Sequence, residues 1–127
     1  MTYLLDTAVL FWAMTDPGAL SRKALRICED PKIKRVISTA SLWEMAVKCS
    51  IGKMKIGPVS STLSEWVAKL NARVLPLEAA HAYEVYNLPL LHKDPFDRML
   101  IAQALVEDLV LVTNDEDIHR YDIKWLW

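Results

Sequence analysis

The sequence predicts an α/β fold in which a parallel sheet lies between layers of helices. Three observations support this prediction. Short apolar runs typical of strands alternate with segments of helical periodicity, and short loops join them. Residues 109–113 form a continuous apolar and largely β-branched run, which is typical of a parallel strand covered on both faces. Residues 94–108 are apolar on nearly all sides of a helix and therefore predict a buried helix.

Turn residues and side-chain periodicity set the limits of each element. A first strand ends at Asp6, and Asp16-Pro17-Gly18 stops the helix that follows it. The apolar spacing from Leu42 to Cys49 is that of one helix face, whereas residues 51–60 form a loop or short hairpin. The expected helices are 8–14, 21–30, 41–50, 64–72, 78–86 and 94–108. The expected strands are 3–5, 36–37, 73–77, 109–113 and 122–127.

Composition narrows the class of protein. The 127 residues suit one domain spanning 1–127, and 53% apolar with 24% charged residues excludes a disordered or low-complexity chain. Only three glycines occur, so there is no glycine-rich phosphate loop. No apolar run reaches membrane-spanning length, and no basic segment precedes Asp6, so we expect neither a membrane span nor a secretory signal. Two cysteines without CxxC spacing fit reduced thiols in a cytoplasmic protein.

Charge is unevenly distributed although the net charge is only −1. Residues 20–60 hold nine basic and three acidic residues, and the remainder holds six basic and thirteen acidic residues. A basic half beside an acidic half is compatible with binding to a polyanion, and equally with an ordinary solvated face.

Four acidic residues recur where an expected strand gives way to a helix: Asp6, Glu44, Asp97 and Asp115. In an open parallel sheet these turns lie along the carboxyl edge, where ligands bind. Carboxylates held close together repel each other unless a cation compensates them, and oxygen ligands suit Mg²⁺ or Mn²⁺. The sequence therefore predicts a metal site at this edge.

Helix capping is the alternative explanation for each acidic residue. Ser41-Leu42-Trp43-Glu44 has the S-x-x-E pattern of a capping box. Asp94 followed by proline reads as a helix N-cap, which puts Asp97 in the first turn facing the helix dipole. Asp6 and Asp115 fit capping positions as well. Capping accounts less well for an acidic residue at so many successive turns.

Four segments together resemble a known family over essentially the whole chain. They are Leu4-Leu5-Asp6-Thr7, the block from Ser41 to Lys48, the block His92-Lys93-Asp94-Pro95-Phe96-Asp97-Arg98 with its continuation to Ala104, and Leu111-Val112-Thr113-Asn114-Asp115-Glu116-Asp117. In order and spacing the chain resembles a PIN domain, and more narrowly the VapC-type toxins of bacterial type II toxin–antitoxin systems. The third block is the most specific of the four.

The resemblance implies a three-layer α/β/α sandwich around a parallel sheet of four to five strands. It implies a metal-dependent endoribonuclease, the toxin of a toxin–antitoxin pair, which hydrolyses RNA through a metal-activated water with one or two Mg²⁺ or Mn²⁺ ions. It also implies a homodimer and an antitoxin partner whose tail occupies the active-site groove. The implied catalytic residues and metal ligands are Asp6, Glu44, Asp97 and Asp115. The implied supporting residues are Asp94, Thr113, Asn114 and Asp117.

Basic and aromatic residues near these acids are candidates for RNA contact. Lys48, Lys93 and Arg98 each neighbour a proposed acid, although Lys48 also has the spacing of a helical ion pair with Glu44. Trp12 and Trp43 could stack bases or pack in the core. The three histidines show no metal-ligand spacing and are expected in surface or capping roles.

Other functions fit the sequence less well. A haloacid-dehalogenase-type phosphatase needs D-x-D, but here the first strand ends in Asp6-Thr7-Ala8. A response-regulator receiver needs an extra early acidic pair and a late lysine, and neither is evident. A non-catalytic RNA- or protein-binding module on the same fold stays open as the alternative to catalysis. The mean hydropathy of +0.14 is consistent with apolar surface covered in a dimer or by a partner.

Overall fold

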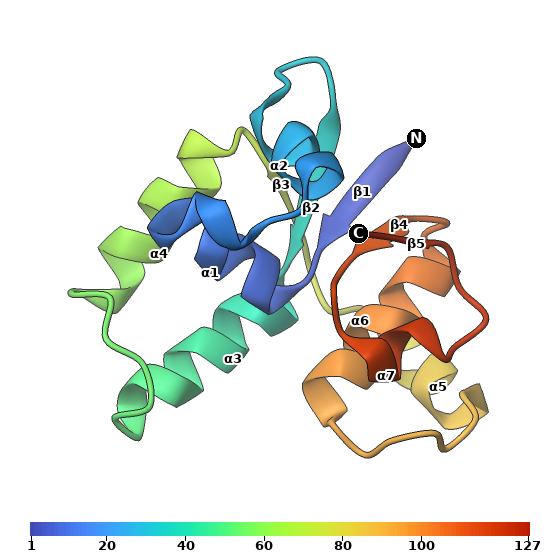
Figure 1. Cartoon of the computed structure of the whole chain (residues 1–127). Coiled ribbons are helices and arrows are strands. Elements are labelled where there is room, and N and C mark those ends of the chain that lie inside the picture. The colour runs from blue at the N-terminus through green and yellow to red at the C-terminus, as the bar shows by residue number, and fades with distance from the viewer.

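The computed structural model describes all residues 1–127 and contains one sheet of five strands, all parallel, in the order β3-β2-β1-β4-β5. The first strand of the chain therefore lies at the centre of the sheet (Figure 1). The strands are β1 (Thr2–Leu5), β2 (Lys34–Ser38), β3 (Arg73–Leu75), β4 (Val110–Val112) and β5 (Trp125–Leu126).

Helices cover both faces of this sheet. In Figure 1, α1 to α4 lie on the left of the sheet and α5 to α7 on the right, which confirms the predicted α/β/α sandwich. A short 3₁₀ turn, η1 (Pro17–Ala19), follows α1. The α-helices are α1 (Thr7–Thr15), α2 (Arg22–Glu29), α3 (Thr39–Ser50), α4 (Val59–Lys69), α5 (Ala79–Asn87), α6 (Pro95–Val106) and α7 (Glu116–His119). None of these helices is both long and apolar enough to cross a membrane.

Alternation along the central strands divides the core into two parts. Successive strand residues point to opposite faces of a sheet, so neighbours such as Leu4 and Leu5 enter different layers. One part packs strand residues under α6 and α7, with Leu4, Val36, Leu75, Leu100, Ile101, Leu111 and Ile118 among its members. The other packs them under α1, α2 and α4, with Leu5, Val9, Ile27, Ile37, Leu63, Trp66 and Val112 among its members. Burial on both faces explains the unbroken apolar runs of β1 and β4.

The start of α3 differs from the predicted capping box. The helix begins at Thr39, and its N-cap is Ser38, whose Oγ accepts a hydrogen bond from the amide of Ala40 at 2.9 Å. Ser41 is buried within the helix, and its Oγ accepts a hydrogen bond from Thr7 Oγ1. The predicted boundary was wrong because two serines three residues apart both precede apolar positions. Glu44 is therefore in the second turn and is not a capping residue.

Two further helices differ from the prediction. α4 begins at Val59, directly after Pro58, rather than at residue 64. α7 has only four residues, too few for a periodic pattern, and was not predicted at all. It starts at Asp115, whose Oδ1 accepts a hydrogen bond from the amide of Asp117 at 2.8 Å. The predicted capping role of Asp115 is therefore correct, as is that of Asp94 at the start of α6.

A buried arginine joins two helix ends on the left-hand layer. The guanidinium of Arg35 donates hydrogen bonds at 2.7 Å to the carbonyls of Ile27, Asp30 and Leu70. These carbonyls lie at the C-terminal ends of α2 and α4, where a positive charge also interacts favourably with the negative end of the helix dipole. Part of the basic charge counted in residues 20–60 is thus used inside the protein.

Candidate active site

A cavity of about 310 Å³ opens at the carboxyl edge of the sheet. All four predicted catalytic acids line it, together with Asp94, although they come from four separate segments of the chain. Its only basic lining residue is Lys48. The remaining wall consists of Thr7, Ala8, Phe11, Trp12 and Met54. The cavity lining therefore combines five acidic residues and one basic residue with several apolar side chains.

Asp6 is a buried member of the cavity lining, directly after β1. Its amide, at the end of β1, donates a hydrogen bond to the carbonyl of Val112 in the neighbouring strand, and its side chain is only 6% exposed. The carboxylate makes no capping bond to α1 and instead accepts a hydrogen bond from Thr113 Oγ1 at 2.7 Å. Burial, helped by the charges of Glu44 and Asp115, raises the pKa of Asp6 to about 6.

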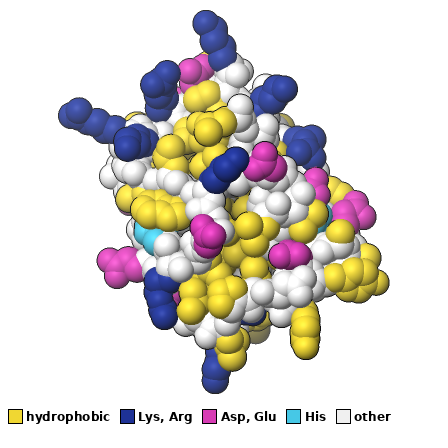
Figure 2. All heavy atoms as spheres, turned by 90° about the vertical axis from the view of Figure 1, so that its right-hand side faces the viewer, with side chains coloured by type: hydrophobic (Ala, Val, Ile, Leu, Met, Phe, Trp, Pro, Cys, Tyr) yellow, Lys and Arg dark blue, Asp and Glu magenta, His cyan; other side chains and the backbone are white.

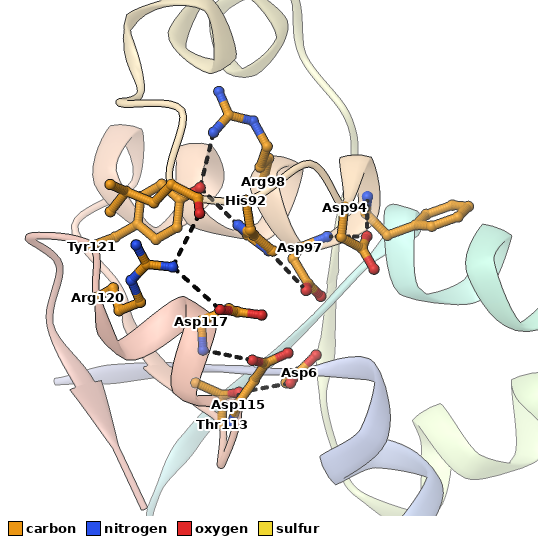
Figure 3. Close-up of polar contacts among 12 residues, drawn as sticks. Asp6, His92, Asp94, Asp97, Arg98, Thr113, Asp115, Asp117, Arg120 and Tyr121 are labelled. Carbon is orange, nitrogen blue, oxygen red and sulfur yellow. Dashed lines mark hydrogen bonds and ion pairs between the residues drawn. The ribbon is translucent and has the colours of Figure 1, made fainter.

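Asp97 lies across the cavity, in the first turn of α6. Its Oδ2 is 3.1 Å from His92 Nε2, and both side chains are mostly buried (Figure 3). Burial raises the pKa of Asp97 to about 8, and the negative charges of the other cavity carboxylates, that of Asp6 first, add to this effect. The two carboxylates at the centre of the site thus retain protons at a pH where ordinary aspartates have lost them.

Glu44 reaches the cavity from α3 and is 8% exposed. Its Oε2 pairs with Lys48 Nζ at 2.7 Å, one helical turn further on. The predicted i,i+4 ion pair is therefore present, and it lies in the cavity wall rather than on a free surface. Lys48 is 42% exposed and remains accessible from the cavity.

Thr113 connects the carboxylates of two segments. Its hydroxyl donates to Asp6 and accepts a hydrogen bond from the amide of Asp115 at 3.1 Å. His119 Nε2 lies 2.7 Å from the carbonyl oxygen of Thr113, which holds the end of β4. These contacts place Thr113 between Asp6 and Asp115. Asp94 caps α6 through the amides of Phe96 and Asp97 and also lines the cavity.

The donor set suits a hard divalent cation. All five cavity acids offer carboxylate oxygens, the ligands that Mg²⁺ and Mn²⁺ prefer. The raised pKa values of Asp6 and Asp97, caused first by burial and then by neighbouring carboxylates, show that the surroundings of these two side chains disfavour their ionised forms. No three His, Cys, Asp or Glu side chains converge on one point as a formed metal site. The carboxylates instead line the cavity walls, and their negative charges contribute to the raised pKa values of Asp6 and Asp97.

Several predicted residues lie outside this cavity. Arg98 is 8% exposed, and its guanidinium donates to the carbonyls of Pro89, Val85 and Leu88 and to Tyr121 Oη. The prediction that Arg98 contacts RNA is therefore corrected, because the side chain is directed into the protein. Neither Asn114 nor Asp117 lines the cavity: Asn114 is exposed, whereas the Asp117 side chain pairs with Arg120 and its amide donates a hydrogen bond to Asp115 Oδ1. Lys93 is exposed next to Asp94.

Sequence reasoning missed His92 and Tyr121. His92 lies against Asp97, whereas only a surface or capping role was expected for it. The one sequence signal was its position five residues before Asp97. Tyr121 is 29 residues further along the chain, so only the fold brings its hydroxyl to 2.8 Å from His92 Nδ1. Of the two tryptophans, Trp12 lines the cavity, whereas Trp43 is 57% exposed and packs its ring edge on Phe96.

Comparison with known proteins agrees with this fold. The family described as "PIN domain" matches residues 3–124. No curated protein matches the sequence. The fold is similar to chains in VapBC2 from Rickettsia felis bound to a promoter DNA fragment (18% identity, 99% and 98% of the two chains covered, TM-score 0.75). The fold is also similar to a chain of DNA-bound VapBC from Salmonella typhimurium (17% identity, 99% and 97% of the two chains covered, TM-score 0.69). A toxin–antitoxin complex from Klebsiella pneumoniae contains a further similar chain (17% identity, 98% and 96% covered, TM-score 0.65). Because the family match spans almost the whole chain, the protein belongs to the PIN-domain family.

Proposed function

We propose that the protein is a metal-dependent endoribonuclease and the toxin of a toxin–antitoxin pair. The observation that carries the proposal is the convergence of Asp6, Glu44, Asp97 and Asp115 on one cavity, with raised pKa values for Asp6 and Asp97. These are the four positions at which the sequence resembles the VapC-type toxins. Similarity in fold to VapBC and toxin–antitoxin complexes supports the same proposal.

Each residue has a task that follows from its surroundings. Asp6 and Asp97 hold one or two Mg²⁺ or Mn²⁺ ions, with Glu44 and Asp115 completing the oxygen ligands. When bound, the metal acts as a Lewis acid that acidifies water and neutralises charge on the phosphoryl oxygens. Thr113 orients Asp6 through its hydroxyl. Lys48, the only basic residue of the cavity, binds a phosphate of the RNA, and Phe11 and Trp12 exclude water from the apolar side.

An antitoxin and a second copy of the chain are the proposed partners. The acidic cavity suits a basic antitoxin segment. Figure 2 views the molecule from the side of α5 to α7, where hydrophobic side chains gather among charged ones. In α5 and the segment after it, Tyr83, Tyr86 and Leu90 are 74%, 92% and 72% exposed. Sedimentation is expected to show a dimer, and a stable monomer at tens of micromolar would contradict this part.

Cleavage of labelled RNA tests the catalytic proposal. Protein freed of any partner is incubated with single-stranded and structured RNA in Mn²⁺, Mg²⁺ or chelator. Asp6→Asn and Asp97→Asn are run beside it, with Asp122→Asn, an exposed acid outside the cavity, as the matched control. Cleavage is expected only with metal, in the wild type and in Asp122→Asn.

Each other outcome has a definite meaning. Equal cleavage by all variants would assign the activity to a contaminating ribonuclease. No cleavage with either metal, while every variant melts cooperatively, would contradict the enzyme and favour a non-catalytic RNA- or protein-binding module on the same fold. RNA binding without cleavage in the same samples would identify which module it is.

A further inference from the structure

Two arginines fix the backbone that carries His92. The segment between α5 and α6 has no regular structure of its own. Arg98 donates from inside the protein to the carbonyl of Pro89 at 2.8 Å, and Arg120 donates to the carbonyl of Leu91 at 3.1 Å. These two hydrogen bonds fix the backbone of the loop and therefore the position of the residue that follows Leu91. That residue is His92, whose side chain is directed toward Asp97 (Figure 3).

A chain of hydrogen bonds then selects the form of the imidazole. Arg98 Nη1 donates to Tyr121 Oη at 2.9 Å, since a guanidinium has no acceptor. Tyr121 Oη accepts this bond and has one proton to donate, and we assign that proton to the hydrogen bond with His92 Nδ1 at 2.8 Å. With Nδ1 accepting, the proton of the neutral ring resides on Nε2, which faces Asp97 Oδ2 at 3.1 Å. The Tyr121 ring also meets the His92 ring edge to face, at a centroid distance of 5.4 Å.

We propose that His92 is a positioning residue for Asp97, kept in its Nε2–H form by Tyr121 and Arg98. The hydrogen bond to His92 engages Oδ2 and leaves Oδ1 free for a cation in the cavity. Hydrogen-bonded partners of this kind orient ligating carboxylates, and their loss weakens metal binding about 10- to 100-fold. The inference rests on the proposed role of Asp97 as a metal ligand.

Nitrogen NMR of the metal-free protein tests the first half of the inference. At one fixed pH, the His92 ring is expected to show a protonated Nε2 and an unprotonated Nδ1. Tyr121→Phe keeps the ring contact but removes the hydroxyl, so it is expected to give a mixture of the two forms. Tyr86→Phe, whose hydroxyl lies on a residue 92% exposed, is the matched control and leaves His92 unchanged. A dominant Nδ1–H form in the wild type would overturn the inference.

Titration with Mn²⁺, followed by calorimetry, tests the second half without any RNA. His92→Leu is expected to weaken Mn²⁺ binding about tenfold or more, and His92→Gln, which retains an amide donor near the place of Nε2, to restore most of it. Melting temperatures identify any variant that fails to fold, and Tyr121→Phe supplies a second, milder perturbation. The rescue by glutamine separates positioning from mere packing, which leucine would satisfy.

Failure of this inference and failure of the proposed function give different results. If Asp97→Asn loses Mn²⁺ binding while His92→Leu and Tyr121→Phe bind as tightly as the wild type, the inference is wrong and the metal site stands. If Asp97→Asn also binds Mn²⁺ like the wild type, Asp97 is not a ligand, and both the metal site and the inference are wrong.

Discussion

Asp97 is the residue at which the demands of stability and of the proposed chemistry conflict most clearly. It is buried beside other carboxylates, and its pKa is raised to about 8. A group whose pKa is higher in the folded than in the unfolded protein stabilises the fold while it is protonated and loses that contribution as it ionises. The metal-free protein therefore loses stability as pH rises and Asp97 ionises. A bound cation would neutralise the carboxylate and so remove this loss.

Stability against pH gives the first prediction. In chelator, the free energy of unfolding is expected to fall as pH rises from about 4 to about 8, because the pKa of Asp97 is 3.8 when unperturbed and about 8 in the fold. The pKa of Asp6, about 6, adds to the fall over the lower part of this range. Asp97→Asn is expected to flatten the profile and to be more stable than the wild type at pH 8. Denaturant unfolding at several pH values measures this free energy. A pH profile of Asp97→Asn equal to that of the wild type would refute the prediction.

Lys48 gives the second prediction, because it has two roles with opposite effects. It neutralises Glu44 at 2.7 Å and thereby competes with a metal, yet it is the only basic group available for a phosphate in the cavity. Lys48→Gln is expected to strengthen Mn²⁺ binding several-fold. In chelator, it is expected to reduce the slope of log RNA affinity against log salt by roughly one.

Calorimetry and fluorescence anisotropy measure the two effects of Lys48→Gln. Lys69→Gln is the matched control, since Lys69 forms the same i,i+4 pair with Glu65 at an exposed site outside the cavity. An RNA salt dependence equal to that of the control would show that Lys48 contacts no phosphate.

Among the elements, α2 and α4 depend on a side chain from the sheet. Arg35, in β2, donates hydrogen bonds to carbonyl oxygens at the C-terminal ends of both helices. Carbonyls at a helix end lack intrahelical partners, and here one guanidinium supplies the donors for both ends. The buried ends would otherwise leave carbonyl oxygens without donors. The strand thus fixes the position of two helices in the layer that carries α1 and Asp6.

Arg35→Met gives the third prediction. Removing the guanidinium leaves three carbonyl oxygens near the protein interior without their donor, and the free energy of unfolding is expected to fall by about 3 kcal/mol. Lys34→Met, at the exposed neighbouring position of β2, is expected to change it little. Urea unfolding compares the two variants. A loss in Arg35→Met no larger than that in Lys34→Met would contradict the assignment.

The elements also show where sequence reasoning succeeds and where it stops. α6 was predicted almost to its ends because Asp94 and Pro95 define its start and its body is apolar on nearly all sides. The start of α3 was misplaced because a local S-x-x-E pattern competed with Ser38, and only the packing of Ser41 against Thr7 decides between them. Arg98 was placed at the RNA surface because its neighbours are acidic, and sequence gives no measure of the carbonyls that bind it. Local patterns specify a helix, whereas long-range partners specify the direction of its side chains.

At the scale of the whole molecule, the sheet order accounts for the site. β1 lies between β2 and β4, so their carboxyl ends and the start of α6 bring together acids up to 109 positions apart in sequence, Asp6 and Asp115. The alternation of strands with helices in the sequence predicted that these acids would lie at the carboxyl edge of the sheet. It could not predict the pairing of His92 with Tyr121, which depends on how the loop before α6 meets the end of α7. The same convergence that forms the site concentrates negative charge in one cavity.

Stabilisation of the whole protein by a divalent cation is the fourth prediction. A ligand that binds the folded but not the unfolded chain raises the melting temperature, and the gain grows with its concentration relative to the Kd. Mn²⁺ is expected to raise the melting temperature of the wild type at pH 8 and to raise it less at pH 5, where both Asp97 and Asp6 are mostly protonated. Asp97→Asn should start from a higher melting temperature in chelator and gain little from Mn²⁺, whereas Asp122→Asn should follow the wild type. Differential scanning calorimetry at pH 5 and pH 8, with Mn²⁺ or with chelator, measures these melting temperatures. If Mn²⁺ raised the melting temperature of Asp97→Asn as much as that of the wild type, the cation would bind elsewhere and the proposed site would be wrong.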